Sequence, residues 1–396
     1  MLDLYAVCLL ATLAISFTYY IAHAPYSAKD RRLTSLRMIR NLLDPPDASV
    51  EDLLLARSIP NDRLTRAFEL TNTFVSPDPS VHIHFRETAI HMLQSAPKWP
   101  KFLNTSIEAV SVSLPDTVVP FDRFIQEVTM RVVLTGLLHA TDDMAQLEPD
   151  DIHIVSALIT ELWTLSKKPD HIDGVLLEKL NHHLRRLIPD EQRYPNPLDY
   201  VIPSWETLWR VVAAVIRSVH SNTEYRTAFA AFYNKPDTIQ YREHQQLQAS
   251  VEGIILETLR LYPPSKRIAR AVRPSSLTQR LCPVPLSYFT DTNATQVYTA
   301  DIESVHMSET IWGPNASAFD ARRVYGNSAD PRTILAFGYG PLKCVAKQWA
   351  PIATAVIVAA VLDRVNATEY RLIEGCGSGG RNDWNGWTIC RVDRSK

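Results

Sequence analysis

One cysteine of this chain lies where its surroundings could give it chemistry. The run Phe337-Gly338-Tyr339-Gly340-Pro341-Leu342-Lys343-Cys344 brings a thiol to the start of an apolar stretch, 345–362, that we expect to form a helix. The two glycines and the proline favour a tight loop around the sulfur, and the positive end of a helix favours a thiolate. Such a thiolate could be an axial ligand of haem iron. The alternative is a buried structural cysteine beside a turn.

The spacing F-x-x-G-x-x-x-C-x-A in this run resembles the haem-thiolate signature of the cytochrome P-450 superfamily. Upstream, Glu257-Thr258-Leu259-Arg260 is similar to the E-x-x-R helix of that family, and Phe319-Asp320-Ala321-Arg322-Arg323 to its F-x-P-x-R segment, with Ala321 in place of the usual proline. The resemblance implies haem b as the cofactor. It implies that Cys344 is the iron ligand and that Phe337, Gly338 and Gly340 shape the cofactor-binding loop around it.

The same resemblance implies a structural triad. Glu257 and Arg260 are three residues apart, so they share one face of a helix and can pair. Arg323 is expected to complete the ion-paired triad and to hold the polar segment before the cysteine loop. Breaking one side of a buried pair of this kind costs about 3–5 kcal/mol.

Basic residues upstream of the triad could hold the carboxylates of a haem. The stretch 78–86, DPSVHIHFR, resembles the D-P-P-E-H-x-x-x-R segment of soluble bacterial members of the family, with His82 and Arg86 four residues apart on one helix face. The alternative for this pair is a solvated helix face. Arg270 matches a further haem-propionate position, with Arg267 and Lys266 as alternatives if the register differs.

The segment expected over the haem departs from the family pattern A/G-G-x-D/E-T. Its best register is Pro203-Ser204-Trp205-Glu206-Thr207, which keeps the acid and the alcohol but not the small residues. Glu206 and Thr207 could relay protons to bound dioxygen through water, and proline could produce a local helix break. The alternative is that both residues belong to the first turn of a helix. Leu342 stands where the family often has a propionate-binding His or Arg.

The order of elements indicates a protein that is mainly α with a small β portion, an α+β organisation with the cytochrome P-450 fold. Only 12 of the 396 residues are glycine, against roughly 28 expected from average usage, and 7 of them lie at or beyond Gly338. A body this poor in glycine favours helices. Apolar periodicity predicts them at about 62–74, 81–96, 122–138, 152–167, 174–188, 198–220 and 240–262, and a strand-rich stretch at 268–302. Residues 369–391 are expected to form a short hairpin.

The amino terminus predicts a membrane anchor. Leu4 to Ala22 carries no charge for 19 residues, enough for a helix to cross a hydrocarbon core, and five basic residues follow it by position 40. We expect an anchor at 1–24, a connection at 25–60 and a single haem-thiolate catalytic domain at 61–396. The protein would be single-pass in the endoplasmic reticulum membrane, with its catalytic domain cytosolic. The alternative is a cleaved signal peptide.

The composition excludes several functional classes. Apolar residues make up 46% and charged residues 21%, which excludes a disordered chain, and the net charge of −2 gives no broad reason to bind nucleic acid.

The resemblance implies a monooxygenase that inserts one oxygen atom from dioxygen into a small, apolar organic substrate. Electrons would come from an NADPH-cytochrome reductase on the same membrane. The short, divergent sequence is similar in style to fungal enzymes of secondary metabolism.

Two other functions keep the haem. One is a non-oxygenating isomerase, dehydratase or cyclase, which the replacement of the small residues by Pro203-Ser204 suggests. The other is a non-catalytic haem-binding membrane protein.

Overall fold

The computed structural model describes residues 31–244, 248–272, 295–325, 333–365, 369–377 and 380–392. The first half of the chain forms β1 (Arg31–Leu33), α2 (Leu36–Leu43), α3 (Val50–Phe68), α4 (Pro79–Ser95), α5 (Trp99–Ser113), β2 (Val118–Pro120), α6 (Phe121–Gly136), η1 (Met144–Gln146), α7 (Pro149–Ser166), α8 (Gly174–Leu187) and α9 (Leu198–Trp205). The second half forms α10 (Leu208–Val219), α11 (Thr223–Asn234), α12 (Thr238–Arg242), α13 (Val251–Leu261), β3 (Arg267–Val272), β4 (Gln296–Asp301), α15 (Ile302–His306), α16 (Glu309–Trp312), η3 (Arg323–Tyr325), η5 (Val345–Lys347), α17 (Ala350–Val365), β5 (Tyr370–Ile373) and β6 (Thr388–Arg391).

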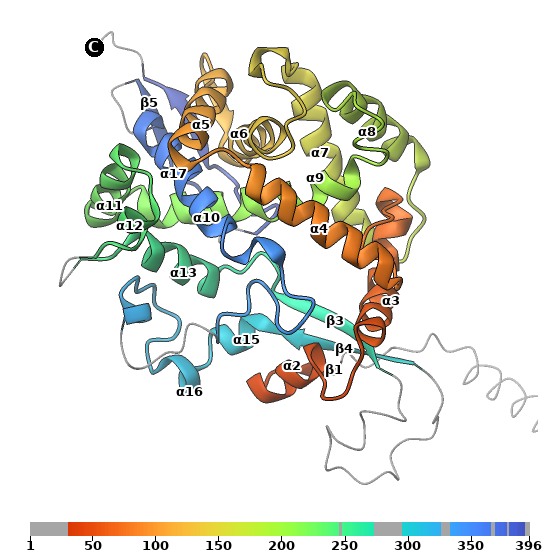
Figure 1. The fold of residues 1–396 in the computed structure, drawn as a ribbon. Coiled ribbons are helices and arrows are strands. Elements are labelled where there is room, and N and C mark those ends of the chain that lie inside the picture. Colours follow the sequence, from red (N-terminus) through yellow and green to blue (C-terminus); the bar gives the residue numbers. More distant parts are fainter. Residues whose placement is uncertain are drawn as a thin grey trace, which may run out of the picture.

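Helices form one side of the molecule and a small sheet with short helices forms the other (Figure 1). The helical side is built around α17, which is buried along nearly its whole length and packs against α5, α10, α11 and α13. One large apolar core runs through these helices. The protein is therefore mainly α with two small sheets, as the sequence predicts.

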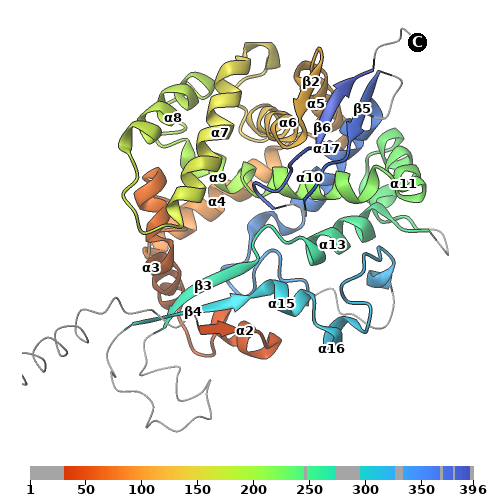
Figure 2. The same ribbon diagram turned by 180° about the vertical axis from the view of Figure 1, so that it is seen from behind.

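The two sheets have three strands each. In the first, β4 lies between β1, which it pairs in parallel, and β3, which it pairs antiparallel. This sheet shares a second, smaller apolar core with α2 and α15. Figure 2 shows the sheet and these two helices from behind. In the second sheet, β6 lies between β2 and β5. The pairing of β5 with β6 agrees with the hairpin expected over 369–391.

Residues 31–60 form regular structure, although the sequence led us to expect a connection over 25–60. Besides β1 and α2, they include the first turns of α3, which begins at residue 50 and not near 62. A capping box explains this start, because the Ser49 hydroxyl accepts from the Asp52 amide and the Asp52 carboxylate accepts from the Ser49 amide. This segment is an integral part of the fold.

The predicted membrane anchor, 1–24, lies outside the described residues. Within the part of the chain that is described, no helix is both long enough and apolar enough to cross a bilayer. The anchor stays a prediction from sequence.

Two helical glycines differ in what surrounds them, and the difference can be tested. A Cβ at Gly253 in α13 would lie 2.3 Å from the carbonyl oxygen of Ala321, whereas a Cβ at Gly174 in α8 would meet nothing within 4 Å. We expect Gly253→Ala to destabilise the protein by about 1–3 kcal/mol through overpacking. Gly174→Ala should be neutral or stabilise slightly. Urea unfolding of both variants checks this, and equal stabilities would contradict the close packing of α13 against Ala321.

Candidate functional site

The cysteine loop is closed by hydrogen bonds along its own backbone. The Cys344 amide donates to the Phe337 carbonyl at 2.9 Å, and the Gly338 amide donates to the Leu335 carbonyl at 2.8 Å. Gly338 and Gly340 have φ angles of +73° and +72°, in the left-handed region that other residues rarely adopt. The two glycines are therefore required by the turn that presents Cys344.

Cys344 itself is exposed and lies at the start of η5. Protein atoms packed around the sulfur raise the pKa of the thiol, and a hydrogen bond from the Ala346 amide opposes that rise. The predicted helix over 345–362 begins later than expected, because residues 345–347 form a single 3-10 turn and α17 starts at Ala350. One turn has little of a helix dipole, so a thiolate here depends on a bound metal ion, which deprotonates a coordinating thiol.

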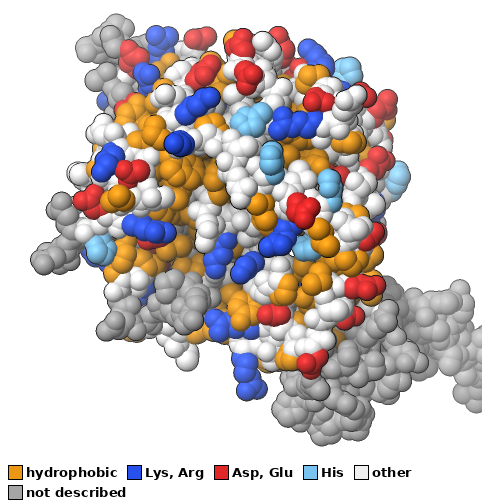
Figure 3. Space-filling view, viewed as in Figure 1, with side chains coloured by type: hydrophobic (Ala, Val, Ile, Leu, Met, Phe, Trp, Pro, Cys, Tyr) orange, Lys and Arg blue, Asp and Glu red, His pale blue; other side chains and the backbone are white. Residues whose placement is uncertain are grey.

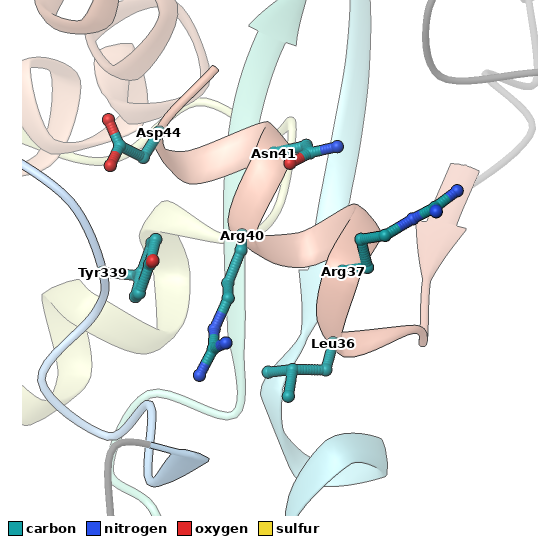
Figure 4. Close-up of a pocket in the computed structure, with 6 residues that line it drawn as sticks. All are labelled: Leu36, Arg37, Arg40, Asn41, Asp44 and Tyr339. Carbon is teal, nitrogen blue, oxygen red and sulfur yellow. The ribbon is translucent and has the colours of Figure 1, made fainter. Parts of the chain in front are cut away.

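Helix α2 supports the loop from the side, as Figure 4 shows. A Cβ at Gly340 would lie 2.7 Å from the Cβ of Asp44, so α2 and the loop are in direct contact. The Arg40 guanidinium stacks over the Tyr339 ring at 5.2 Å. Beside this contact is a pocket of about 280 Å³ lined by Leu36, Arg37, Arg40, Asn41, Asp44 and Tyr339. Its largely polar lining differs from the mostly apolar lining of typical small-molecule sites.

The structure brings Glu257, Arg260 and Arg323 together. Arg260 donates through Nε and Nη2 to the two carboxylate oxygens of Glu257, at 2.8 and 2.7 Å, and both side chains are buried, with 0% and 1% of their area exposed. Arg323 Nε donates to Glu257 Oε1 at 3.2 Å, and the Asp320 amide donates to the same oxygen at 3.0 Å. The carboxylate thus holds a helix and the segment 320–323 at once.

The two arginines of this triad also bind backbone carbonyls. Arg260 Nη1 donates to the carbonyls of His306 and Ala316, both at 2.6 Å, and Arg323 Nη1 donates to that of Trp312 at 2.9 Å. Irregular segments that have few hydrogen bonds of their own are fixed in this way. The triad is therefore a structural anchor for the segment that leads to the cysteine loop.

His306, which the sequence analysis did not single out, joins the triad to the cysteine loop. Its Nδ1 donates to the Arg260 carbonyl at 2.9 Å, and its Nε2 accepts from the Leu335 amide at 2.9 Å. This arrangement fixes a neutral imidazole. Burial lowers the pKa of His306 to about 4. The sequence around His306 does not indicate this linking role, because its partners Leu335 and Arg260 lie 29 and 46 residues away.

Basic side chains gather where a haem could place its carboxylates. His82 in α4 hydrogen-bonds Thr73 Oγ1 at 2.8 Å, and Arg57 in α3 donates to the same oxygen. Burial, followed by the charges of Arg57 and Arg86, lowers the pKa of His82. Burial, followed by the charge of Arg270, lowers the pKa of Arg57 to about 9. The three residues predicted from sequence and Arg57 therefore form one group, which we call the Arg57 cluster.

The Arg57 cluster fits two carboxylates. The side chains of Arg57 and Arg270 are buried, and the Nε atom of each lacks an acceptor in the described part of the chain. Helix α4, which carries His82 and Arg86, packs against η5 beside Cys344. Lys and Arg side chains also gather near the middle of the face shown in Figure 3. Cys344 would hold the iron of a haem, and this cluster would bind its propionates.

The sequence analysis does not include Arg57, because it predicts a connection over 25–60. A signal was present, since Arg57 follows Leu53 and Leu54 at helical spacing and so stands on the apolar face of its helix. A buried cation on such a face needs an anionic partner. Leu342 stands where the family often has a cationic propionate ligand, and it carries no charge. Arg57 supplies a cation to the cluster instead.

Glu206 and Thr207 lie at a break between α9 and α10. Pro203 has no amide hydrogen to continue the ladder of α9, and the Ser204 hydroxyl donates to the Tyr200 carbonyl at 2.7 Å. Glu206 is buried, and its carboxylate pairs with Arg381 and, at 3.5 Å, with Arg210. Thr207 is half-buried. The acid of the predicted proton relay is therefore held by two arginines.

The triad predicts a large difference between two glutamates of one helix. Glu257→Gln keeps the side-chain shape but leaves the buried Arg260 without its counter-ion, so we expect a loss of about 3–5 kcal/mol. Glu252→Gln breaks a pair with Arg242, whose side chain is 68% exposed, and should cost less than about 1 kcal/mol. Denaturant titration of both variants measures this, and similar losses would refute the anchoring role.

His306 predicts a pH dependence of stability. The folded state holds the imidazole at a pKa of about 4, below its ordinary value of 6.5, so the unfolded state binds the proton more readily. The stability from this residue, up to about 3 kcal/mol, is complete above pH 6.5 and is lost as the pH falls towards 4. Relative to wild type, His306→Gln should be destabilised at pH 7 and progressively less so towards pH 4. The exposed His84→Gln is the control, and a difference independent of pH would contradict the prediction.

Comparison with known proteins agrees with the resemblance found in the sequence. Residues 228–369 match the family model for cytochrome P450, a segment that contains the triad and the cysteine loop. A cytokinin hydroxylase of Arabidopsis thaliana is 31% identical over 121 residues, which are 30% of this chain and 21% of that protein. Cytochrome P450 734A6 of Oryza sativa subsp. japonica is 28% identical over 34% of this chain and 24% of its own length.

These matches cover only part of each protein. The matched regions span about a fifth to a quarter of the length of the two relatives. The family model matches residues 228–369, in the second half of this chain. Both relatives are plant proteins, so they give no support to a fungal origin. The chain is therefore similar over residues 228–369 to the cytochrome P450 family, in which haem b is bound through a cysteine thiolate, and the loop that presents Cys344 agrees with this similarity.

Proposed function

We propose that the protein is a haem-thiolate monooxygenase that inserts one oxygen atom from dioxygen into a small organic substrate. The observation that carries this proposal is the exposed Cys344 thiol on a loop beside the Arg57 cluster, with α4 packed against η5. A haem bound there supplies dioxygen activation and oxygen transfer. The printed name of one relative, a cytokinin hydroxylase, supports hydroxylation as the reaction class.

The residues of this chain would divide the work as follows. Cys344 Sγ would hold the iron, and Arg57, Arg86, His82 and Arg270 would orient the cofactor through its carboxylates. Thr207, half-buried at the helix break, would pass protons through its hydroxyl. Glu206 would act beside it by fixing Arg381 and Arg210, since its carboxylate is already paired.

Electrons would come from outside the chain. The sequence contains no recognisable flavin or nicotinamide fingerprint, so we propose an NADPH-cytochrome reductase as the donor. The predicted anchor would place both proteins on the endoplasmic reticulum membrane, with the catalytic domain cytosolic. A role in secondary metabolism completes the proposal.

Iron ligation by Cys344 can be tested by spectroscopy. The reduced protein with carbon monoxide should show the red-shifted Soret band of a thiolate-ligated haem, and Cys344→Ser should lose it because a hydroxyl is a poor substitute for a thiolate. Cys376→Ser, a change at another exposed cysteine, should keep the band. Retention of the band in Cys344→Ser would overturn the assignment.

Reductant use separates the remaining functions. A monooxygenase reconstituted with reductase consumes NADPH and dioxygen together with substrate. Substrate turnover without consumption of NADPH or dioxygen would indicate an isomerase, dehydratase or cyclase, the function that Pro203-Ser204 suggests. A thiolate band with no turnover across a panel of small apolar substrates would indicate a haem-binding protein without catalysis.

A further inference from the structure

A second group of charged side chains lies around the break between α9 and α10. Arg381, from the loop between β5 and β6, and Arg210 in α10 both pair with Glu206. Arg63 in α3 donates to Ser166 Oγ at 2.6 Å, and Lys167 follows at the end of α7. Figure 2 shows α3, α7 and α9 coming together on this side of the molecule. We call these four basic residues the Arg381 cluster.

Positive charge exceeds negative charge in this cluster. Burial lowers the pKa of Lys167, and the charges of Arg381, Arg210 and Arg63 lower it further. Glu206 is the one acid among the described residues that opposes this shift. Burial likewise lowers the pKa of Arg381 to about 10, and Arg210 and Arg63 add to that effect. Four cations thus lie around a single buried carboxylate, and positive charge in excess that is partly shielded from water favours a further anion.

Hydrogen-bond donors are left over as well. The Arg381 side chain is only 8% exposed, yet its Nε and Nη1 have no acceptor among the described residues. Arg210 Nε is buried and equally without an acceptor in that part of the chain. Buried guanidinium N–H groups are normally bonded. These donors are free for one more acceptor group.

The position of the guanidinium groups is fixed by their neighbours. The Trp163 ring is contacted by Arg63 at 5.1 Å and by Arg381 at 5.0 Å, so one indole holds two cations. Arg210 Nη1 donates to the Pro264 carbonyl at 2.8 Å. Lys167 is exposed, so the cluster reaches the surface there. The arginine donors are therefore held in place by their neighbours.

We propose that the Arg381 cluster binds an oxyanion, and that this oxyanion is the carboxylate or phosphate group of the substrate. The planar arginine fork suits both groups. The assignment of the oxyanion to the substrate rests on the proposed function. Glu206 is bonded to Arg381 and adjoins Thr207, the residue expected to face the haem. An acidic substrate bound here would have its charged group held next to the break between α9 and α10.

Anion binding is tested first on the full-length haem-loaded protein by its thermal midpoint. At matched ionic strength with chloride as reference, sodium acetate or sodium phosphate should raise the midpoint of the wild type. Arg381→Gln and Lys167→Met should reduce or abolish the rise. Arg66→Gln is the matched control, because Arg66 is exposed one turn from Arg63 and binds the carbonyls of Ser166, Lys168 and Pro169.

A third variant separates binding from a structural role. Glu206→Gln removes the carboxylate that now pairs with Arg381, so added acetate or phosphate should raise its midpoint more than that of the wild type. No rise in the wild type, an equal rise in Arg381→Gln, or a smaller rise in Glu206→Gln would each overturn the anion site. Lys167→Met changes an exposed side chain and leaves the Glu206–Arg381 pair intact. It therefore remains informative if Arg381→Gln does not fold.

The substrate half is tested with laurate and its uncharged methyl ester as probes of the haem Soret band. The wild type and Arg66→Gln should bind laurate at least tenfold more tightly than the ester, which is about 1.4 kcal/mol. Arg381→Gln should lose the preference. If phosphate or acetate stabilises the protein but laurate is not preferred, the ligand is a free anion and the substrate assignment fails. Absence of a thiolate band would instead refute the proposed function, while the thermal measurement would still decide the anion site.

Discussion

The rest of the structure depends on one buried ion pair, between Glu257 and Arg260. Both charges are removed from water, so each needs the other and the polar groups around it. Those groups are the carbonyls of residues 306, 316 and 318, the Asp320 amide and Arg323. A single carboxylate thereby organises α13, α15 and the irregular segment after α16. His306 extends this organisation to Leu335, at the foot of the cysteine loop.

The cysteine loop shows what sequence can and cannot provide. Gly338, Gly340 and Cys344 were identifiable because a tight turn imposes its residue types within ten positions. Glu257 and Arg260 were identifiable for the same reason, since helical spacing brings them together. His306 was not, because its partners lie 29 and 46 positions away and no local spacing encodes them. The start of α3 at residue 50 was missed although the Ser49–Asp52 capping box was readable.

Buried arginines give the fold two places where cations outnumber acids, the Arg57 cluster and the Arg381 cluster. Each carries guanidinium donors that the described residues do not satisfy. Unsatisfied donors of this kind lower the stability of the chain in the absence of a ligand. An anion that binds to them restores that stability. Helix α3 contributes Arg57 to one cluster and Arg63 to the other, about one and two-thirds turns apart. One helix therefore carries a basic residue of each cluster.

The parallel pairing of β1 with β4 has a consequence for biosynthesis. Arg31 contacts Tyr298, 267 positions later in the chain. At roughly 5–20 residues per second, a ribosome needs on the order of tens of seconds to supply the partner strand. During that interval β1 and the apolar face of α2 have no sheet to pack on, and the cysteine loop does not yet exist. Cofactor capture must then be one of the last events of maturation, and until it occurs the early segment would be a natural client for chaperones.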